Sequence, residues 1–218
     1  MATGLLSPPD IRTVADLLAR LGRIPAARVR WSPLPGTATK ADVIAIAGRE
    51  ERLCELVDGV LVEKATGPRQ SALAVALSGY LCRFVNPRRL GLVSGAAGMV
   101  ELLPGLVRIP DVAFVSWARV PGGRVLVEPV PDLVPDLVVE VLSRGNTAGE
   151  LARKRCEYFS AGVRLIWIAH PVARTVTVYT APDQSRMLGA AETLDGAPVL
   201  PGFTLPLRDL FAELDRSN

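Results

Sequence analysis

The feature that most constrains the fold is a strand–helix–strand unit in the second half of the chain. Apolar, β-branched runs predict strands at 137–142 and 165–169. The helix between them is expected from about Ala148 to Ala161. It begins after Thr147, which has a Glu three residues later in the pattern of a capping box, and it ends at Gly162. One βαβ unit is therefore predicted, in a protein of the α/β (α+β) class.

The flanking segments predict further strands and one long helix. A tight hairpin is expected at Asp58–Gly59, because this dipeptide tolerates positive φ between two apolar runs. A helix is predicted over 70–85, where apolar residues recur every three or four positions. Residues 1–50 are predicted to form a short N-terminal helical extension, and residues 51–218 a larger domain. The other predicted elements are strands at 91–94, 99–103, 107–109, 111–116 and 175–179, and a short helix at 207–214.

The composition is that of a globular protein with a mild positive charge. Hydrophobic residues make up 49% of the 218 residues, and 25 Lys+Arg against 22 Asp+Glu give a net charge of +3. This excess permits an anionic substrate but does not indicate a concentrated basic face. The N-terminus lacks a signal-peptide pattern and no apolar stretch is long enough for a membrane span, so a cytoplasmic location is expected. Three widely spaced cysteines, Cys54, Cys82 and Cys156, are expected to be reduced and structural.

Several kinds of active site lack the residues they need. The single histidine, His170, has no close pair of cysteines with which to bind zinc. No serine has the Gly-x-Ser-x-Gly surroundings of a serine hydrolase, and neither a dinucleotide-binding glycine pattern nor a phosphate-binding loop is present. A cysteine–histidine pair stays open, although Cys82 and Cys156 lie in predicted helices where thiols usually only pack. What remains is a site in which oxygen atoms, such as those of carboxylates, bind a cation.

Two acids are candidates for such a site. Glu140 lies inside an apolar strand, where a carboxylate must be desolvated, paired or bound to a cation. Asp111 opens an earlier candidate strand, DVAFV, directly after a proline. The structural alternatives are an ion pair between Glu140 and an Arg or Lys, and a turn role for Asp111. The residues alone support these alternatives as well as they support a functional site.

Two predicted helices contribute further polar candidates. Lys154 lies at the edge of the apolar arc of its helix beside Tyr158, from where it could reach inward. The alternative is an exposed pair between Glu150 and Lys154. Gln70 is in phase with the apolar stripe of the helix over 70–85, which places an amide on the core-facing side. A local hydrogen bond at the start of the helix is the favoured alternative for Gln70.

Several ordered motifs make the sequence resemble the Uma-type family of restriction endonucleases, a branch of the PD-(D/E)XK nuclease superfamily. They are CELVDGVLVEK, RIPDVAFVSW, PDLVVEVLS, KRCEYFSAGVRLIWI and LPGFTLPL. The resemblance covers residues 15–213. It implies a restriction-endonuclease-like mixed β-sheet core flanked by helices, a site for Mg²⁺ or Mn²⁺, hydrolysis of phosphodiester bonds in DNA, and a homodimer.

The resemblance also assigns roles to single residues. Asp111 matches the acid of the Pro-Asp motif and Glu140 the acid of the second half-motif, and both would ligate the metal. The superfamily lysine usually lies two residues after the second acid, where this chain has a leucine; in this branch it comes from the following helix, which matches Lys154, with Tyr158 as an auxiliary residue. Relatives usually have Glu or His where this chain has Gln70, whose amide oxygen can ligate a metal but brings no charge.

The resemblance therefore implies a divalent-metal-dependent endonuclease with catalytic Asp111, Glu140 and Lys154 and with Gln70 as an auxiliary ligand. The alternative is a catalytically weakened nucleic-acid-binding or interaction module that retains the nuclease fold, for which Gln70 is the main indication. A third hypothesis is an enzyme that acts on another phosphodiester. Three other positions also depart from the family's usual residues: Arg144, Arg155 and His170.

Overall fold

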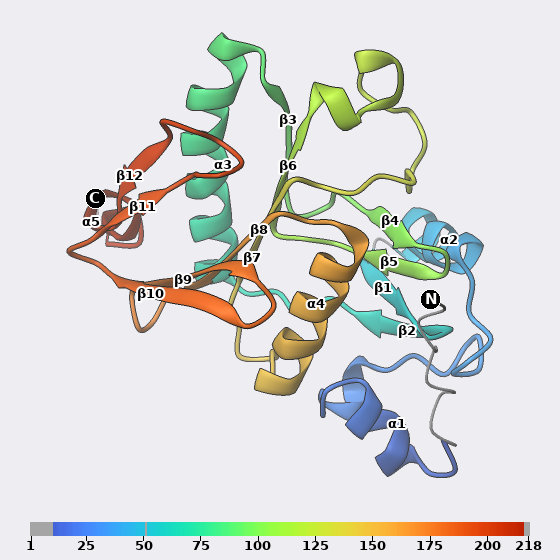
Figure 1. Ribbon diagram of the computed structural model, residues 1–218. Helices are drawn as coiled ribbons and strands as arrows, with labels where there is room; N and C mark the ends of the chain where they lie inside the picture. The colour runs from blue at the N-terminus through green and yellow to red at the C-terminus, as the bar shows by residue number, and fades with distance from the viewer. Residues whose placement is uncertain (1–10, 51, 216–218) are drawn as a thin grey trace, which may run out of the picture.

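The computed structural model describes residues 11–50 and 52–215 (Figure 1). The helices are α1 (Val14–Arg20), α2 (Lys40–Glu50), α3 (Pro68–Arg88), α4 (Ala148–Ala161) and α5 (Leu207–Ala212). The strands are β1 (Cys54–Val57), β2 (Val60–Glu63), β3 (Gly91–Ser94), β4 (Val100–Leu103), β5 (Leu106–Arg108), β6 (Val112–Ser116), β7 (Leu137–Val141), β8 (Leu165–His170), β9 (Thr175–Ala181), β10 (Gln184–Gly189), β11 (Thr193–Asp195) and β12 (Thr204–Pro206).

A six-stranded mixed sheet forms the centre of the molecule, in the order β10-β9-β8-β7-β6-β3. The pair β7–β8 is parallel, and the other neighbours in this sheet are antiparallel. Helix α4 makes the parallel connection. It is capped by Thr147, whose side chain accepts a hydrogen bond from the Glu150 N–H, and it ends at Gly162 with φ 102°. The predicted βαβ unit and mixed sheet are thus confirmed.

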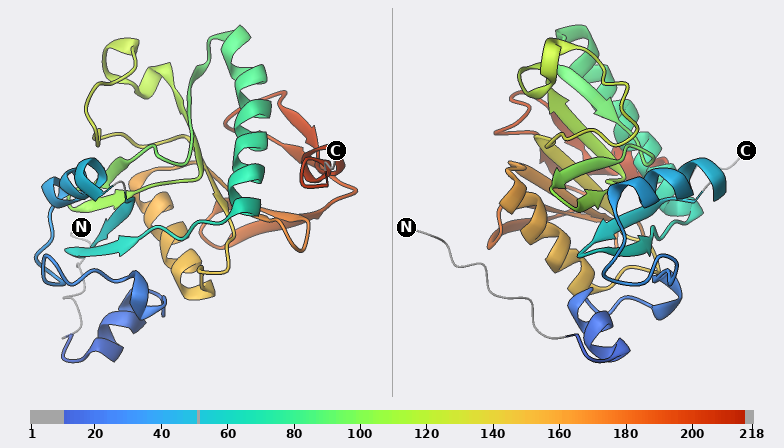
Figure 2. Two further views of the ribbon diagram at one scale, coloured as in Figure 1. Left: turned by 180° about the vertical axis from the view of Figure 1, so that it is seen from behind. Right: turned by 90° about the vertical axis from the view of Figure 1, so that its right-hand side faces the viewer.

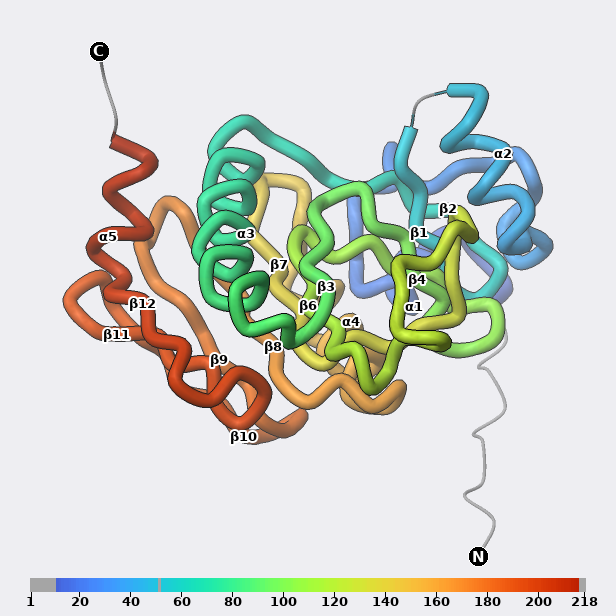
Figure 3. The backbone as a smooth tube through the Cα atoms, turned by 90° about the horizontal axis from the view of Figure 1, so that it is seen from above, coloured from blue at the N-terminus to red at the C-terminus, as the bar shows by residue number. Residues whose placement is uncertain are grey.

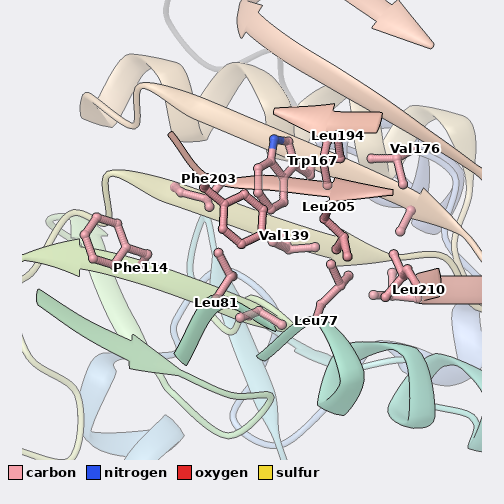
Figure 4. Packing of buried hydrophobic residues seen from close by; sticks show 14 of the residues in the cluster. Leu77, Leu81, Phe114, Val139, Trp167, Val176, Leu194, Phe203, Leu205 and Leu210 are labelled. Atoms are coloured by element: carbon pink, nitrogen blue, oxygen red, sulfur yellow. The ribbon is translucent and has the colours of Figure 1, made fainter. Parts of the chain in front are cut away.

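Helices cover the two faces of this sheet (Figures 1 and 2). Side chains along β7 alternate, so that Val139 belongs to the cluster with α3 and Val138 to the cluster with α4. The α3 side is an apolar core in which Leu77 and Leu81 face Trp167 (Figure 4). Glu140 follows the alternation of Val138 and therefore lies on the α4 side of the sheet.

A second, antiparallel sheet with the order β2-β1-β5-β4 lies beside the first. Its β1–β2 hairpin turns at Asp58 (φ 51°) and Gly59 (φ 70°), as the dipeptide predicts. Chain connectivity joins the two sheets, because only Ile109, Pro110 and Asp111 separate β5 from β6. The N-terminal segment lies beside this second sheet (Figure 3). Leu17 and other apolar residues of the segment pack against the hairpin.

The C-terminal part of the fold differs most from the prediction. Strands β10, β11 and β12 lie between the predicted strand at 175–179 and the predicted helix at 207–214, where the sequence predicts no strand. Short, largely exposed strands carry little periodicity in the sequence. Cys156 is exposed rather than buried, whereas Cys54 is buried and burial raises its thiol pKa to about 11.

Among the described residues, the structure contains no helix that is both long and apolar enough to cross a membrane.

Candidate functional site

The candidate residues meet where the end of β7 adjoins the second sheet. Glu140 comes from β7, Asp111 immediately precedes β6, and Lys154 and Tyr158 come from α4. Gln70 lies in the first turn of α3. All five side chains belong to buried residues, with Gln70 the most exposed at 6%. The structure thus brings together every residue that the sequence singled out for the site.

Asp111 is fixed beside the strand that carries Glu140. Its backbone N–H donates to Val139 O at 3.1 Å, and its Oδ2 accepts a hydrogen bond from the Val141 N–H at 2.7 Å. Asp111 is therefore bonded to the residues on both sides of Glu140. The amide of Gln70 donates to both carboxylate oxygens of Asp111, at 2.9 Å each. The alternative of a local hydrogen bond at the start of the helix is thus wrong for the Gln70 NH₂ group, which donates to Asp111, 41 residues further along the chain.

Glu140 receives two donors from α4. Tyr158 donates its hydroxyl to Glu140 Oε1 at 2.6 Å. Lys154 Nζ lies 3.2 Å from Oε1 and 3.3 Å from Oε2 of the same carboxylate. The exposed Glu150–Lys154 pair is therefore a wrong alternative. Both residues are buried, and Glu150 is paired with Arg28 at 2.7 Å instead.

A third buried acid, Glu55 on β1, links this site to the second sheet. Glu55 Oε1 lies 2.9 Å from Lys154 Nζ and accepts a hydrogen bond from the Ile109 N–H at 3.2 Å. Its Oε2 lies 2.6 Å from Arg108. Arg108 also forms an ion pair with Glu157 on α4. This network holds the ammonium of Lys154 between two carboxylates.

Burial and neighbouring charges set the protonation states of the network. Burial raises the pKa of Glu140, and repulsion from Asp111 and Glu55 adds to this effect against the attraction of Lys154. Burial also opposes ionisation of Glu55, but the charges of Lys154 and Arg108 outweigh it and lower its pKa to about 2. Glu55 is therefore the more firmly ionised of these two acids.

Lys154 and Tyr158 stay protonated in this setting. Burial lowers the pKa of Lys154, but Glu140 and Glu55 outweigh it, so the pKa lies above the ordinary value. Burial, with the charge of Glu140, raises the pKa of Tyr158 well above its ordinary value. Lys154 is thus a fixed positive charge and Tyr158 a hydrogen-bond donor. Neither group is suited to accept a proton near neutral pH.

The sequence interpretation missed three members of the site: Glu55, Arg108 and Lys64. Lys64 follows β2, and its Nζ lies 2.9 Å from Asp111 Oδ1. Two signals could have found Glu55 and Lys64. Glu55 is an acid inside an apolar strand, as Glu140 is, and Lys64 is one of only three lysines among 25 basic residues. Two of those three lysines, Lys64 and Lys154, lie in this site.

The oxygen donors of the site fit a hard divalent cation. Among the described residues, no group of three or more His, Cys, Asp or Glu side chains is arranged as a metal site. Mg²⁺, however, is usually held by one or two carboxylates and keeps several waters. Asp111 and Glu140 supply the carboxylates. The buried Oε1 of Gln70 has no hydrogen-bond partner in the described part of the chain, so it is an available neutral oxygen beside them.

The three other positions that the sequence singled out, Arg144, Arg155 and His170, lie in different parts of the fold. Arg144 is exposed in the segment after β7, and Arg155 stacks on the ring of Tyr179, 4.8 Å from its centroid. His170 accepts a hydrogen bond at Nδ1 from the Ala173 N–H at 3.1 Å, at the end of β8. These contacts give Arg155 and His170 local structural roles.

Comparison with known proteins gives a family and a fold. The family model Uma2, described as "Putative restriction endonuclease", matches residues 41–208. A crystal structure described as a "putative nuclease belonging to DUF820" from Anabaena variabilis superposes with a TM-score of 0.67 at 19% sequence identity. The match covers 75% of this chain and 92% of that one. None of the curated proteins matches this chain.

Proposed function

Because this chain belongs to the Uma2 family, whose model is described as "Putative restriction endonuclease", we propose that it is a divalent-metal-dependent nuclease that hydrolyses phosphodiester bonds in DNA. One observation carries the proposal. The Lys154 ammonium lies 3.2 Å from Glu140, next to the position where Asp111 is bonded to both neighbours of Glu140. Two adjacent carboxylates with one buried lysine supply metal ligands and a positive charge at a single point.

Asp111 and Glu140, with Gln70 Oε1, are the residues that would hold Mg²⁺ or Mn²⁺. A divalent cation held there would polarise the scissile phosphate and lower the pKa of a bound water. The raised pKa of Glu140 is consistent with this role, since a nearby dication favours the ionised carboxylate that burial and the other acids disfavour.

Lys154 and Tyr158 would act on the phosphate through charge and hydrogen bonding. Lys154 is held as a cation by Glu55 and Glu140, so it stabilises negative charge that develops on the phosphate oxygens. Tyr158 donates to Glu140 Oε1 and thereby fixes the orientation of that carboxylate. Glu55 is a positioning residue, because it would act on the phosphate only by holding Lys154 in place.

Two exposed arginines offer a contact surface for the DNA backbone. Arg69 directly precedes Gln70, and Arg144 lies in the segment after β7. The two segments are close, because a Cβ at Gly145 would lie 2.9 Å from the Cβ of Ala65. Neither arginine forms an ion pair within residues 11–50 and 52–215. We propose that they bind phosphates on either side of the scissile bond.

A second candidate is a DNA-binding or interaction module with weakened catalysis. The contacts of Asp111 favour it, because Gln70 and Lys64 already donate to this carboxylate. Such a protein would bind DNA through the same arginines without cutting it. The homodimer, the cytoplasmic location and the boundary at residue 50 stay predictions.

Nicking of supercoiled plasmid in the presence of Mg²⁺ or Mn²⁺ tests the proposal. The wild type is compared with Glu140→Gln and Lys154→Met, and with Lys40→Met as a matched control. Lys40 is an ion-paired lysine outside the site, 2.7 Å from Glu101. We expect metal-dependent nicking by the wild type and Lys40→Met, and its loss in both site variants. Plasmid binding without nicking by the wild type would replace the nuclease with the binding module.

A further inference from the structure

Lys64 occupies a defined position against the proposed metal ligand Asp111. Its Nζ donates to Ile109 O at 2.7 Å and to Ala96 O at 3.3 Å, and it lies 2.9 Å from Asp111 Oδ1. The Lys64 side chain is only 4% exposed. A lysine ammonium has three donor hydrogens, so these three contacts use all of them.

The carboxylate of Asp111 is equally saturated. Oδ1 accepts hydrogen bonds from Lys64 and from the amide of Gln70, and Oδ2 accepts from the same amide and from the Val141 N–H. An ionised carboxylate has about four acceptor positions. Any further ligand of Asp111 must therefore replace one of these donors.

The three donors differ in how readily they can leave. The Val141 N–H belongs to the backbone of β7 and is fixed by the sheet. The Gln70 amide is neutral, and rotation of the amide would direct its unpartnered Oε1 toward a cation. Lys64 carries a positive charge on the same oxygen that a cation would bind, and like charges this close repel strongly inside a protein. Lys64 is thus the donor whose contact a cation most directly opposes.

We infer that Lys64 is an intrinsic competitor of the divalent cation at Asp111, so that metal binding is an exchange in which the Lys64 ammonium gives up this carboxylate. The inference rests on the proposed function, because it assumes that Asp111 ligates a metal. The exchange requires little movement. Once Lys64 leaves Asp111, its Nζ keeps two acceptors, Ile109 O and Ala96 O. Lys64 therefore sets the metal concentration at which the site fills.

Calorimetric titration of EDTA-treated protein with Mn²⁺ measures this competition. The variants are Lys64→Met, which removes the charge, Lys64→Arg, which keeps it, and Lys40→Met as the matched control. We expect Lys64→Met to bind Mn²⁺ about tenfold more tightly or better, since a repelling charge is gone. Lys64→Arg and Lys40→Met should stay within about threefold of the wild type. Asp111→Asn should abolish binding in the wild-type and Lys64→Met backgrounds.

The outcomes separate this inference from the proposed function. Equal Mn²⁺ affinity of the wild type and Lys64→Met, with binding lost in Asp111→Asn, would overturn the role of Lys64 and leave the metal site standing. Absence of Mn²⁺ binding in the wild type and in Lys64→Met would overturn both. Lys64→Gln, which keeps a hydrogen-bond donor without the charge, replaces Lys64→Met if that variant does not fold, with the same expected tightening.

A measurement on the wild type needs no substitution. The chain has three lysines, so their side-chain NMR signals are separable, and Lys64→Arg and Lys40→Met assign two of them. We expect addition of Mg²⁺ to speed the exchange of the Lys64 ammonium protons with water, because one of their three acceptors is withdrawn. The Lys40 signal should not change. Unchanged Lys64 exchange at saturating Mg²⁺ would contradict the exchange mechanism.

Discussion

Lys154 Nζ and Glu55 Oε1 lie 2.9 Å apart, which connects helix α4 to the hairpin of the second sheet. The same ammonium contacts Glu140 on the central sheet. The proposed catalytic charge is therefore positioned by both sheets at once. Its orientation depends on how the second sheet packs, not only on the strand that carries Glu140.

Replacement of Glu55 by Gln should destabilise the protein strongly at neutral pH. The change leaves Lys154 and Arg108 in the interior with one carboxylate fewer, and removal of one partner of a buried ion pair costs about 3–5 kcal/mol. Urea unfolding at pH 7 measures the difference. Glu63→Gln, on a neighbouring strand with a side chain 27% exposed, serves as the control and should cost less than about 1 kcal/mol. If Glu55→Gln were as stable as the wild type, the ion pairs of Glu55 would contribute nothing to the free energy of unfolding.

The contribution of Glu55 should depend on pH in a defined window. Its pKa in the folded protein is about 2, below the ordinary value of 4.5. The stabilisation is therefore present above about pH 4.5 and is lost as the pH falls toward 2. The stability difference between the wild type and Glu55→Gln should shrink over this range in unfolding experiments at several pH values. A difference that stays constant from pH 5 to pH 2.5 would disagree with this account.

Replacement of Glu140 by Gln should have the opposite effect on stability while abolishing nicking. The pKa of Glu140 lies above its ordinary value because burial and the other acids disfavour its charge more than Lys154 favours it, whereas at Glu55 the attraction of Lys154 and Arg108 prevails. Ionisation of Glu140 thus costs stability at neutral pH, and the cost is absent below the unfolded pKa of 4.5. In EDTA at pH 7 the variant should be at least as stable as the wild type, and the gain should vanish near pH 4. A marked loss of stability at pH 7 would assign Glu140 a structural role.

Part of this arrangement is predictable from the sequence because the signals are local. The apolar run around LVVEV, the capping residue Thr147 and the Asp58–Gly59 turn each act within a few positions, and the elements they predict are confirmed. Glu140 stands out for the same reason, as an acid inside an apolar strand. A residue whose role follows from a single strand, helix or turn can therefore be predicted from the sequence.

The rest of the site depends on packing between the two sheets. The contacts from Glu55 and Lys64 reach residues contributed by other elements, Lys154 and Asp111. No periodicity within β1 or β2 indicates those partners. Composition contains a weak signal instead: a chain that uses arginine for nearly all of its positive charge places two of its three lysines here. A lysine retained in such a chain is worth examining as a site residue.

Removal of the two exposed arginines should weaken DNA binding without affecting the fold. Arg69→Ala and Arg144→Ala together should reduce affinity for duplex DNA and make its dependence on salt less steep by up to about 2 in the log–log slope, since each phosphate contact contributes about 0.9. Fluorescence anisotropy at several salt concentrations gives this slope. Arg208→Ala is the control, because Arg208 is an exposed arginine on α5, at the opposite end of the molecule from the second sheet (Figure 3). An unchanged slope in the double variant would place the DNA elsewhere.

Replacement of Tyr158 by Phe should alter the pH dependence of nicking rather than the fold. The Tyr158 hydroxyl donates to Glu140 Oε1 at 2.6 Å, and a hydrogen bond to a carboxylate favours its ionised form. Without it the pKa of Glu140 rises further, so the acidic limb of the pH–rate profile should move to higher pH and the rate at neutral pH should fall about tenfold. Tyr80→Phe, on a tyrosine that stacks with Arg83, is the control and should keep the wild-type profile. A tenfold lower rate with an unshifted acidic limb would mean that Tyr158 acts on the substrate and not through Glu140.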